Sequence, residues 1–369
     1  MKIKSAETLR AALPLVTPFR TVHSHANTRE LLLLHITTDV GEGWGECSAF
    51  PSAGYSLETL DSAQRALEAM FLPALAHREI SEWREVRELL QGWEQFRAAT
   101  HSIETAVADA LLSSLGRPLS DDLGGTQTRI PVGVVVGFES DLETLVSVVA
   151  SYVADGYARV KVKIRPGWDR EPLQAIRNAF PNLALQVDAN GSYSRVDIEE
   201  LCGLDVFGLL MIEQPFAPDD LDTHVKLAQI AVTPVCLDES ITSAASARRA
   251  IELGACSIVS VKPSMVGGLR EAVAIHDVCV DAGVDLWCGG MLESGIGRCA
   301  AVALASLPGF TLAADLSASA RYFARDITQP FLLEESTLRV PTGVGLGVQI
   351  DEDALVELGA VRRMVDLKL

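Results

Sequence analysis

From Ile130 onward the chain alternates short, continuous apolar runs with longer amphipathic stretches. Continuous apolar runs are typical of parallel strands buried on both faces, and amphipathic stretches are typical of the helices that cover such a sheet. Eight runs occur, at residues 132–138, 159–164, 183–187, 208–212, 234–237, 257–261, 284–287 and 310–314. The pattern therefore predicts eight strand–helix repeats.

Eight repeats are the number that a (β/α)8 barrel of the TIM type needs, and roughly 200 residues suffice for a compact one. A doubly wound open sheet is the rival architecture. It would need a glycine-rich phosphate-binding turn after its first strand, and Gly133 and Gly137 do not supply one. We therefore expect an α/β protein built around a modified TIM barrel.

The part before the barrel has a mixed pattern. Residues 1–7 alternate polar and apolar positions like a strand, and the apolar run 31–36 leads through a turn at 39–43 to a hairpin partner at 43–47. Helical spacing follows at 57–71 and 102–115, and Gly116 is a plausible C-cap for the second helix. These elements predict an α+β capping domain.

The domain division that we expect has three parts. Residues 1–125 form the α+β capping domain, and residues 126–320 form the barrel with the active site. Residues 321–369 have few strand signals and include the turn-rich stretch 341–347, so we expect this segment to return to the capping domain.

Composition excludes several classes of function. The 369 residues are 48% hydrophobic with a net charge of -18, which fits a large core and argues against nucleic acid or an anionic membrane as partner. No signal peptide or membrane span is evident. The seven cysteines are scattered without paired spacing, which favours free thiols in a reducing compartment. We expect a cytoplasmic protein.

Polar residues end five successive apolar runs. Each lies 24 or 25 residues after the one before, in the order Lys163, Asp188, Glu213, Asp238 and Lys262. The carboxyl ends of barrel strands converge on one mouth, where active sites of this fold lie. Taken alone, each acid could be a helix N-cap and each lysine a residue that reaches out to solvent. The repeated spacing makes it improbable that all five residues have only such structural roles.

Three close carboxylates repel one another unless a cation lies among them, and an all-oxygen ligand set favours a hard ion such as Mg²⁺, with Mn²⁺ as an alternative. A metal between two lysines suits removal of a proton next to a carboxylate, because the negative charge that develops must be stabilised. A lysine whose pKa is lowered by neighbouring positive charge could act as the base.

Several motifs carry a resemblance to a known family. They are K-x-K at 161–163, D-A-N at 188–190, E-Q-P at 213–215, D-E at 238–239 and V-K-P at 261–263. In this order they resemble the enolase superfamily, and the lysine positions look most like its muconate-lactonising subgroup. The segment 287–297 is similar to o-succinylbenzoate synthases of menaquinone biosynthesis and to N-succinyl- or N-acylamino-acid racemases.

The resemblance implies roles for particular residues. Lys163 and Lys262 would be acid/base partners on opposite faces of the substrate, and Asp188, Glu213 and Asp238 would bind Mg²⁺. Further residues would contact substrate or support the site: Lys161, Asn190, Glu239, Val135, Cys288, Gly290, Met291, Phe19 and Tyr55. The implied substrate is a small carboxylate, and the implied assembly is a homo-oligomer.

Alternatives stay open where the sequence departs from the usual pattern. Val135 stands where a serine is common, Met265 where racemases often carry arginine, and 21–24 where Thr-Ser-Phe-Gly is common. Another cycloisomerase, racemase or epimerase is therefore an alternative, as are a Schiff-base aldolase using Lys262 and a non-enzymatic binding barrel. His23, His25 and His35 are more simply surface residues than a metal cluster, although His23 could touch substrate.

Overall fold

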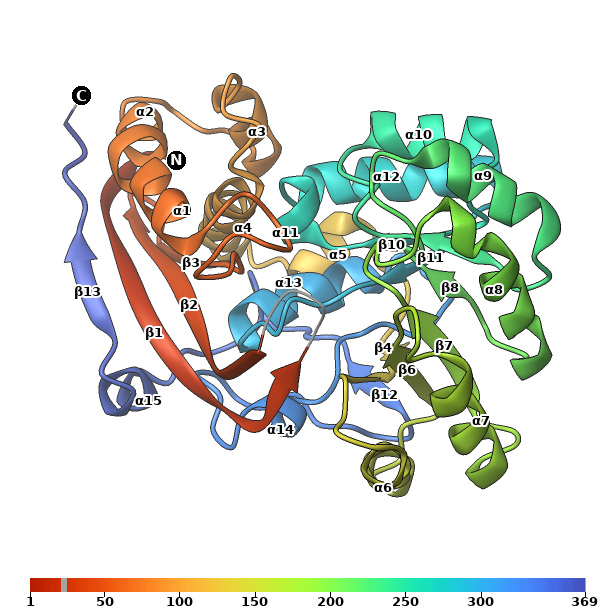
Figure 1. Ribbon diagram of the computed structural model, residues 1–369. Coiled ribbons are helices and arrows are strands. Elements are labelled where there is room, and N and C mark those ends of the chain that lie inside the picture. Colours follow the sequence, from red (N-terminus) through yellow and green to blue (C-terminus); the bar gives the residue numbers. More distant parts are fainter. Residues whose placement is uncertain (21–24, 369) are drawn as a thin grey trace.

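The computed structural model describes residues 1–20 and 25–368. Figure 1 shows an antiparallel sheet with its helices on one side of the molecule and a curled parallel sheet with its helices on the other. The two parts face each other across the carboxyl ends of several parallel strands, which is where the candidate site lies.

The N-terminal sheet has the strand order β13-β1-β2-β3. Its strands are β1 (Ile3–Arg20), β2 (His25–Thr38), β3 (Glu42–Cys47) and β13 (Val361–Met364), and all neighbours pair antiparallel. The strand predicted at the N-terminus and the hairpin predicted around residues 39–43 are both present. In β2, four consecutive residues are completely buried: Leu31, Leu32, Leu33 and Leu34. This strand therefore lies in the core of the N-terminal part.

The helices of this part pack against the sheet or against one another. They are α1 (Leu60–Ala66), the π-helical η1 (Leu67–Phe71), α2 (Leu72–Ala76), η2 (Trp83–Glu85), α3 (Val86–Leu89), α4 (Arg97–Ser114) and α5 (Leu119–Leu123). The helix predicted from residue 57 begins at Leu60, because Thr59 and Ser62 form a capping box there. The second predicted helix ends as expected, with Gly116 in the left-handed region at φ 66°.

The parallel sheet contains seven strands in the order β11-β10-β9-β8-β7-β6-β5. They are β5 (Val134–Val136), β6 (Arg159–Lys163), β7 (Ala184–Asp188), β8 (Ile212–Glu213), β9 (Val235–Leu237), β10 (Ile258–Val261) and β11 (Asp285–Cys288). Each falls within or beside one of the predicted runs, so the alternating pattern located them correctly.

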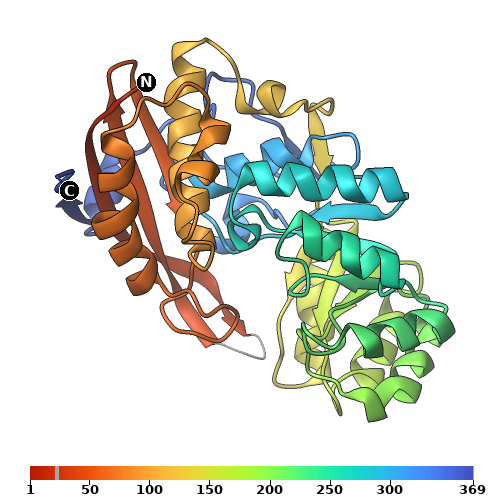
Figure 2. The same cartoon turned by 90° about the horizontal axis from the view of Figure 1, so that it is seen from above.

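Helices connect these strands and cover the outside of the sheet, as the green and turquoise helices of Figure 2 show. They are α6 (Leu142–Ala154), α7 (Arg170–Ala179), η3 (Arg195–Asp197), α8 (Ile198–Cys202), η4 (Gly203–Phe207), α9 (Leu221–Ile230), α10 (Ala244–Leu253), α11 (Pro263–Val266), α12 (Leu269–Ala282) and α13 (Gly295–Ala305).

The eighth predicted run, residues 310–314, differs from the prediction because it is not a regular strand. It still joins the two edges of the sheet. The N–H of Leu312 donates to the carbonyl of Leu286 at 3.2 Å, and the N–H of Ala314 donates to the carbonyl of Pro131 at 2.9 Å. Single parallel bridges on either side replace a continuous ladder, so the barrel closes irregularly at this point.

The C-terminal segment contacts both parts. After α14 (Ser319–Tyr322), β12 (Thr337–Arg339) pairs antiparallel with β4 (Arg129–Pro131) beside the barrel. Helix α15 (Glu352–Glu357) then leads to β13, which pairs with β1. None of the helices in the described ranges is long and apolar enough to cross a membrane.

Candidate active site

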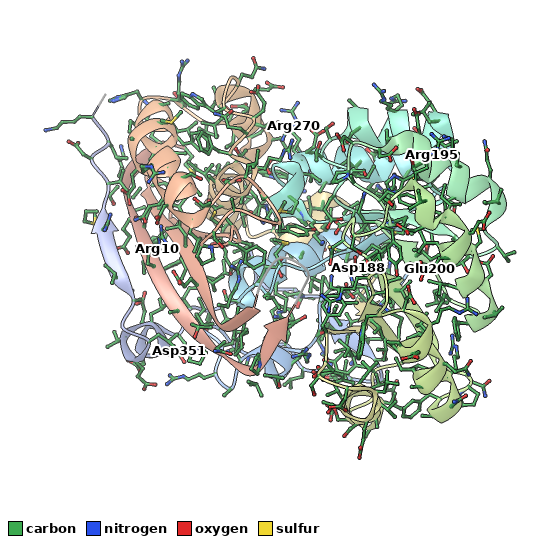
Figure 3. All side chains as sticks on the ribbon, in the orientation of Figure 1. Arg10, Asp188, Arg195, Glu200, Arg270 and Asp351 are labelled. Atoms are coloured by element: carbon green, nitrogen blue, oxygen red, sulfur yellow. The ribbon has the colours of Figure 1, made fainter. Side chains whose placement is uncertain are left out.

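The five polar residues with repeated spacing lie at one end of the parallel sheet. Lys163, Asp188 and Glu213 are the last residues of β6, β7 and β8, while Asp238 and Lys262 directly follow β9 and β10. In the sheet register Asp188 lies beside Lys163 on one side and beside Glu213 on the other. Figure 3 shows Asp188 at the side of the barrel that faces the N-terminal sheet.

Both lysines of β6 form ion pairs with acids at this end of the sheet, and both lie within ion-pair distance of Asp188. Lys163 Nζ donates to Asp188 Oδ2 at 2.6 Å and to Asn190 Oδ1 at 2.7 Å. Lys161 Nζ lies deeper in the barrel, where it donates to Glu213 Oε2 at 2.8 Å and pairs with Asp315. Both lysines are buried, and each has the anionic partner that a buried charge needs.

Lys262 lies on the other side of the acids. Its Nζ donates to Asp238 Oδ2 and to the hydroxyl of Tyr55. The Tyr55 hydroxyl in turn donates to Asp238 Oδ2 at 2.8 Å. Tyr55 comes from the loop between β3 and α1, so the N-terminal part of the chain contributes directly to this cluster.

Side-chain amides hold the strand ends in position. Gln214 Oε1 accepts from the backbone N–H of Asp238 at 3.0 Å, and its Nε2 donates to Ser240 Oγ at 2.8 Å. Asn190 Nδ2 donates to Glu239 Oε1 at 2.9 Å. Both amide residues have positive φ, 38° for Gln214 and 43° for Asn190, a strained conformation that often accompanies a functional site.

Burial and mutual charge shift the pKa values of these groups. Burial opposes ionisation of Asp188, but the Lys163 and Lys161 ammonium groups outweigh it and lower the pKa of Asp188. Burial and the nearby Asp188 charge raise the pKa of Glu213 well above its usual value. For Glu239, burial and the Asp238 charge raise the pKa to about 8. The cluster contains more carboxylates than its lysines fully neutralise.

The carboxylates around Lys262 raise the pKa of its ammonium group. Burial alone would lower the pKa, but the carboxylates of Asp238, Glu213 and Glu239 outweigh burial and raise it. Carboxylates raise the pKa of Lys161 in the same way against the effect of burial, and Asp315 contributes most. The prediction of a lysine pKa lowered by positive charge refers to a site that holds a metal ion, so it stays a prediction.

Within the described residues, no group of three His, Cys, Asp or Glu side chains is arranged closely enough to hold a metal ion. The carboxylates of Asp188, Glu213 and Asp238 are instead each paired with at least one lysine. Two oxygens of the cluster, Glu213 Oε1 and Glu239 Oε2, are nevertheless buried and have no hydrogen-bond partner there. Buried oxygens of this kind are costly, and a hard cation would satisfy them, so the donor set fits Mg²⁺.

A cavity of about 380 Å³ opens beside the cluster. Barrel residues and residues from the N-terminal part line it together, among them Lys161, Lys163, Asp188, Asn190, Lys262, Val135, Gly290, Met291, Asp315, Tyr322, Arg29, Phe50 and Tyr55. Both lysines proposed for acid/base chemistry therefore line the same cavity, which is large enough for a small carboxylate.

Several other predicted site residues do not line this cavity. Glu239 and Asp238 line a neighbouring cavity on the far side of Tyr55. Cys288 does not line the main cavity; its Sγ faces the carbonyls of Gly289 and Ala301, behind the strand. His35 lies away from the site, stacked on Trp44. The Phe19 side chain lies outside the described part of the structure.

The predictions for His23 and His25 cannot be compared with the structure, because His23 and the His25 side chain also lie outside its described part. Asp315 and Arg29 are among the cavity residues that were not predicted. Asp315 pairs with Lys161 and Arg159, and it follows the eighth apolar run at the position where the other runs end in polar residues. That position was the signal for it. Arg29 precedes an apolar run and had no comparable signal.

Comparison with known proteins adds family information. Residues 3–124 match the N-terminal domain model of mandelate racemase / muconate lactonizing enzyme, and residues 144–354 match the enolase C-terminal domain-like model. An N-succinylamino acid racemase of Amycolatopsis is 48% identical over 94% of this chain and 95% of its own length. An o-succinylbenzoate synthase of Geobacillus kaustophilus is 42% identical over 92% and 91%.

Solved structures agree with these matches. A crystal structure of an enolase superfamily member from Listeria innocua superposes with a TM-score of 0.94 at 37% identity, covering 100% of both chains. The modified TIM barrel with a capping sheet is therefore confirmed as the fold class. The chain belongs to the enolase superfamily, in its mandelate racemase and muconate-lactonising branch of enzymes.

Proposed function

We propose that this protein removes the proton α to a carboxylate group, with Lys163 and Lys262 as the acid/base pair. The outcome is dehydration to o-succinylbenzoate, racemisation of an N-acylamino acid, or both. One observation carries the proposal: both lysines line one cavity, and β7, β8 and β9 separate their strands in the sheet. Their amines therefore approach a bound molecule from different sides.

The roles of the two lysines follow from their surroundings. Lys163 is held by Asp188 and Asn190, and Lys262 is held by Asp238 and Tyr55. As a neutral amine, either can accept the α-proton; as an ammonium, either can return one or stabilise negative charge on the substrate. Racemisation needs both exchanges, whereas dehydration needs one base and one cation.

Asp188, Glu213 and Asp238 would hold Mg²⁺, or Mn²⁺, and Asn190 and Glu239 would orient them. Bound there, the ion supplies a Lewis acid for the substrate carboxylate. The unpaired oxygens of Glu213 and Glu239 support this assignment. Sharing the carboxylates with a divalent cation would also weaken their pull on Lys262, whose pKa would then fall towards the range that a base needs.

The relatives support the two outcomes because their names are those of a racemase and a synthase. Val135 lines the cavity and Met265 lines the neighbouring one, so both departures from the common pattern lie near the substrate. We therefore propose a small carboxylate substrate whose distal group meets Val135. The division into residues 1–125, 126–320 and 321–369, the homo-oligomer and the cytoplasmic location also remain proposals.

A deuterium experiment tests the function. The protein is incubated with Mg²⁺ in D₂O with N-acylamino acids and with the cyclohexadiene carboxylate that o-succinylbenzoate synthases dehydrate. We expect deuterium at the α-carbon with inversion, or loss of water. If neither occurs with any candidate, the proposed outcomes are wrong. Borohydride in the presence of a carbonyl substrate would trap Lys262 only in the aldolase alternative.

A further inference from the structure

The loop that carries Tyr55 has little structure of its own. It connects β3 to α1 and spans residues 48–59, here called the Tyr55 loop. Its tip contains one backbone hydrogen bond, from Gly54 N–H to the carbonyl of Ser56 at 3.3 Å, and residues 51–54 are exposed. Apart from the contacts of Tyr55 itself with Lys262, Asp238 and Phe50, the contacts that position the loop come from its two ends.

Arg29 holds the first end. Its Nη1 donates to the carbonyl of Ala49 at 3.0 Å, and its Nη2 donates to the carbonyl of Ser48 at 2.5 Å. The guanidinium also lies over the ring of Phe50, 4.6 Å from its centre. The strand that contains Arg29 is thereby tied to the loop before the tip begins.

Glu58 holds the second end through helix α4. Its Oε2 accepts from the N–H of Ala98 at 2.8 Å, and its Oε1 accepts from the N–H of Ala99 at 3.0 Å. The first N–H groups of a helix have no partner within the helix, and the N-cap residue Phe96 gives no side-chain hydrogen bond. Glu58, only 7% exposed, therefore caps α4 from a distant part of the sequence.

Helix α4 is a firm support for this contact. It has 18 residues, most of them buried, and it packs against β3 and against α11. Helix α11 begins immediately after Lys262. The same helix thus fixes the segment that follows Lys262 and, through Glu58, the loop that brings Tyr55 to Lys262.

We propose that Glu58 is a positioning residue, which holds the Tyr55 loop on α4 so that the Tyr55 hydroxyl stays on Lys262 and Asp238; its effect on turnover rests on the function proposed above. Glu58 follows Tyr55 by three positions, a span of at most about 10 Å, so displacement of one moves the other. Loss of Glu58 therefore acts on Lys262 through Tyr55.

A double-mutant cycle separates this role from a general structural one. Glu58→Ala is expected to lower kcat/KM about tenfold with most of the loss in kcat, and Tyr55→Phe to lower it by a similar factor. In the Tyr55→Phe protein, adding Glu58→Ala is expected to lower kcat/KM further by less than twofold. Glu58→Gln keeps one acceptor oxygen and is expected to fall in between; it replaces Glu58→Ala throughout if that variant does not fold.

The matched control is Asp109→Asn, at the other end of α4. Asp109 also accepts two backbone N–H groups from other segments, those of Trp44 at 2.9 Å and Leu346 at 2.8 Å. We expect this variant to lower the melting temperature while kcat/KM stays within twofold of the unmodified protein.

Hydrogen exchange gives a readout that needs no substrate. Peptides covering residues 48–59 are expected to exchange at least tenfold faster in Glu58→Ala and unchanged in Asp109→Asn. Unchanged exchange in Glu58→Ala, or a tenfold activity loss that persists in the Tyr55→Phe protein, would overturn the proposal. If the unmodified protein turns over no candidate substrate, the proposed function fails, and the exchange difference still decides whether Glu58 holds the loop.

Discussion

Gly289 lies directly against the side chain of Lys262. A Cβ atom at position 289 would stand 2.5 Å from Cε and 2.7 Å from Cγ of Lys262, closer than real Cβ contacts come. The N–H of Gly289 also donates to the carbonyl of Val261 at 3.0 Å, so the backbone is held in place. Only glycine leaves room for Lys262 in its present position.

Gly289→Ala is therefore expected to displace Lys262 and to lower kcat by about 100-fold, the effect of a displacement near 1 Å in an active site. The melting temperature should fall by only a few degrees. Steady-state kinetics and thermal melting measure both. Gly203→Ala, where the added Cβ meets only the end of Arg170, is the control and should keep full activity. Equal kcat in both variants would contradict the role of Gly289.

Asp315 connects two buried cations. Its carboxylate pairs with Arg159 and Lys161, which are almost completely buried. Asp315→Asn leaves both cations without their shared partner, so we expect the free energy of unfolding to fall by about 3–5 kcal/mol. Urea denaturation measures this. Asp285→Asn removes an exposed acid from the start of β11 and should change stability little; an Asp315→Asn protein as stable as this control would refute the assignment.

The stability of the protein should depend on pH through carboxyls that join its two parts. Glu46 accepts from the N–H groups of Ser294 and Gly297, and Glu104 accepts from those of Leu269 and Arg270. Burial raises the pKa of Glu46 to about 7 and that of Glu104 to about 8, from 4.5.

Between pH 4.5 and these values the folded protein binds more protons at these two sites than the unfolded chain does. Their contribution to stability is therefore full below pH 4.5 and declines as the pH rises, by about 1.4 kcal/mol per pH unit for each carboxyl. Glu104→Gln removes one such group, so the decline between pH 5 and 8 should become shallower by about that amount. Denaturation at several pH values measures this, and the exposed Glu252→Gln should leave the slope unchanged. An unchanged slope in Glu104→Gln would contradict the assignment.

Binding of Mg²⁺ should stabilise the folded protein independently of turnover. At a concentration of 100 times Kd the gain is about 2.7 kcal/mol, which corresponds to a rise of several degrees in melting temperature. EDTA should reverse it, together with activity. Glu213→Gln should abolish the shift, because it removes one of the proposed ligands. A melting temperature that does not respond to Mg²⁺ would exclude the proposed metal site.

The repeated spacing predicted the barrel and the acid cluster because strand length and helix length together fix the repeat. Lys163, Asp188 and Glu213 recur with that repeat and end on adjacent strands as a result. The segment 310–314 followed the same pattern yet forms no regular strand, since it bonds to its neighbours at only a few points. Regular repetition is readable from sequence, and irregular closure is not.

Contacts between the two parts of the chain were harder to predict. Arg29 and Tyr55 reach the cavity from segments far from the barrel residues in sequence, so spacing gives no measure of their separation from Lys262. Cys288 lies on the predicted strand, but its side chain faces away from the cavity. The face on which a side chain lies depends on how side chains alternate at the end of the strand. The direction of the Lys262 pKa shift depends on the carboxylates that tertiary folding places around it.

The central claim is that Lys163 and Lys262 exchange the α-proton from opposite sides of one cavity. It is tested most directly by deuterium incorporation into each enantiomer of a racemisable N-acylamino acid, using the unmodified protein, Lys163→Ala and Lys262→Ala with Mg²⁺, after circular dichroism has shown that all three are folded. We predict that the unmodified protein labels both enantiomers, that each variant labels at most one, a different one in each case, and that racemisation falls by at least about 1000-fold in both. Racemisation at the unmodified rate by either variant would contradict the account.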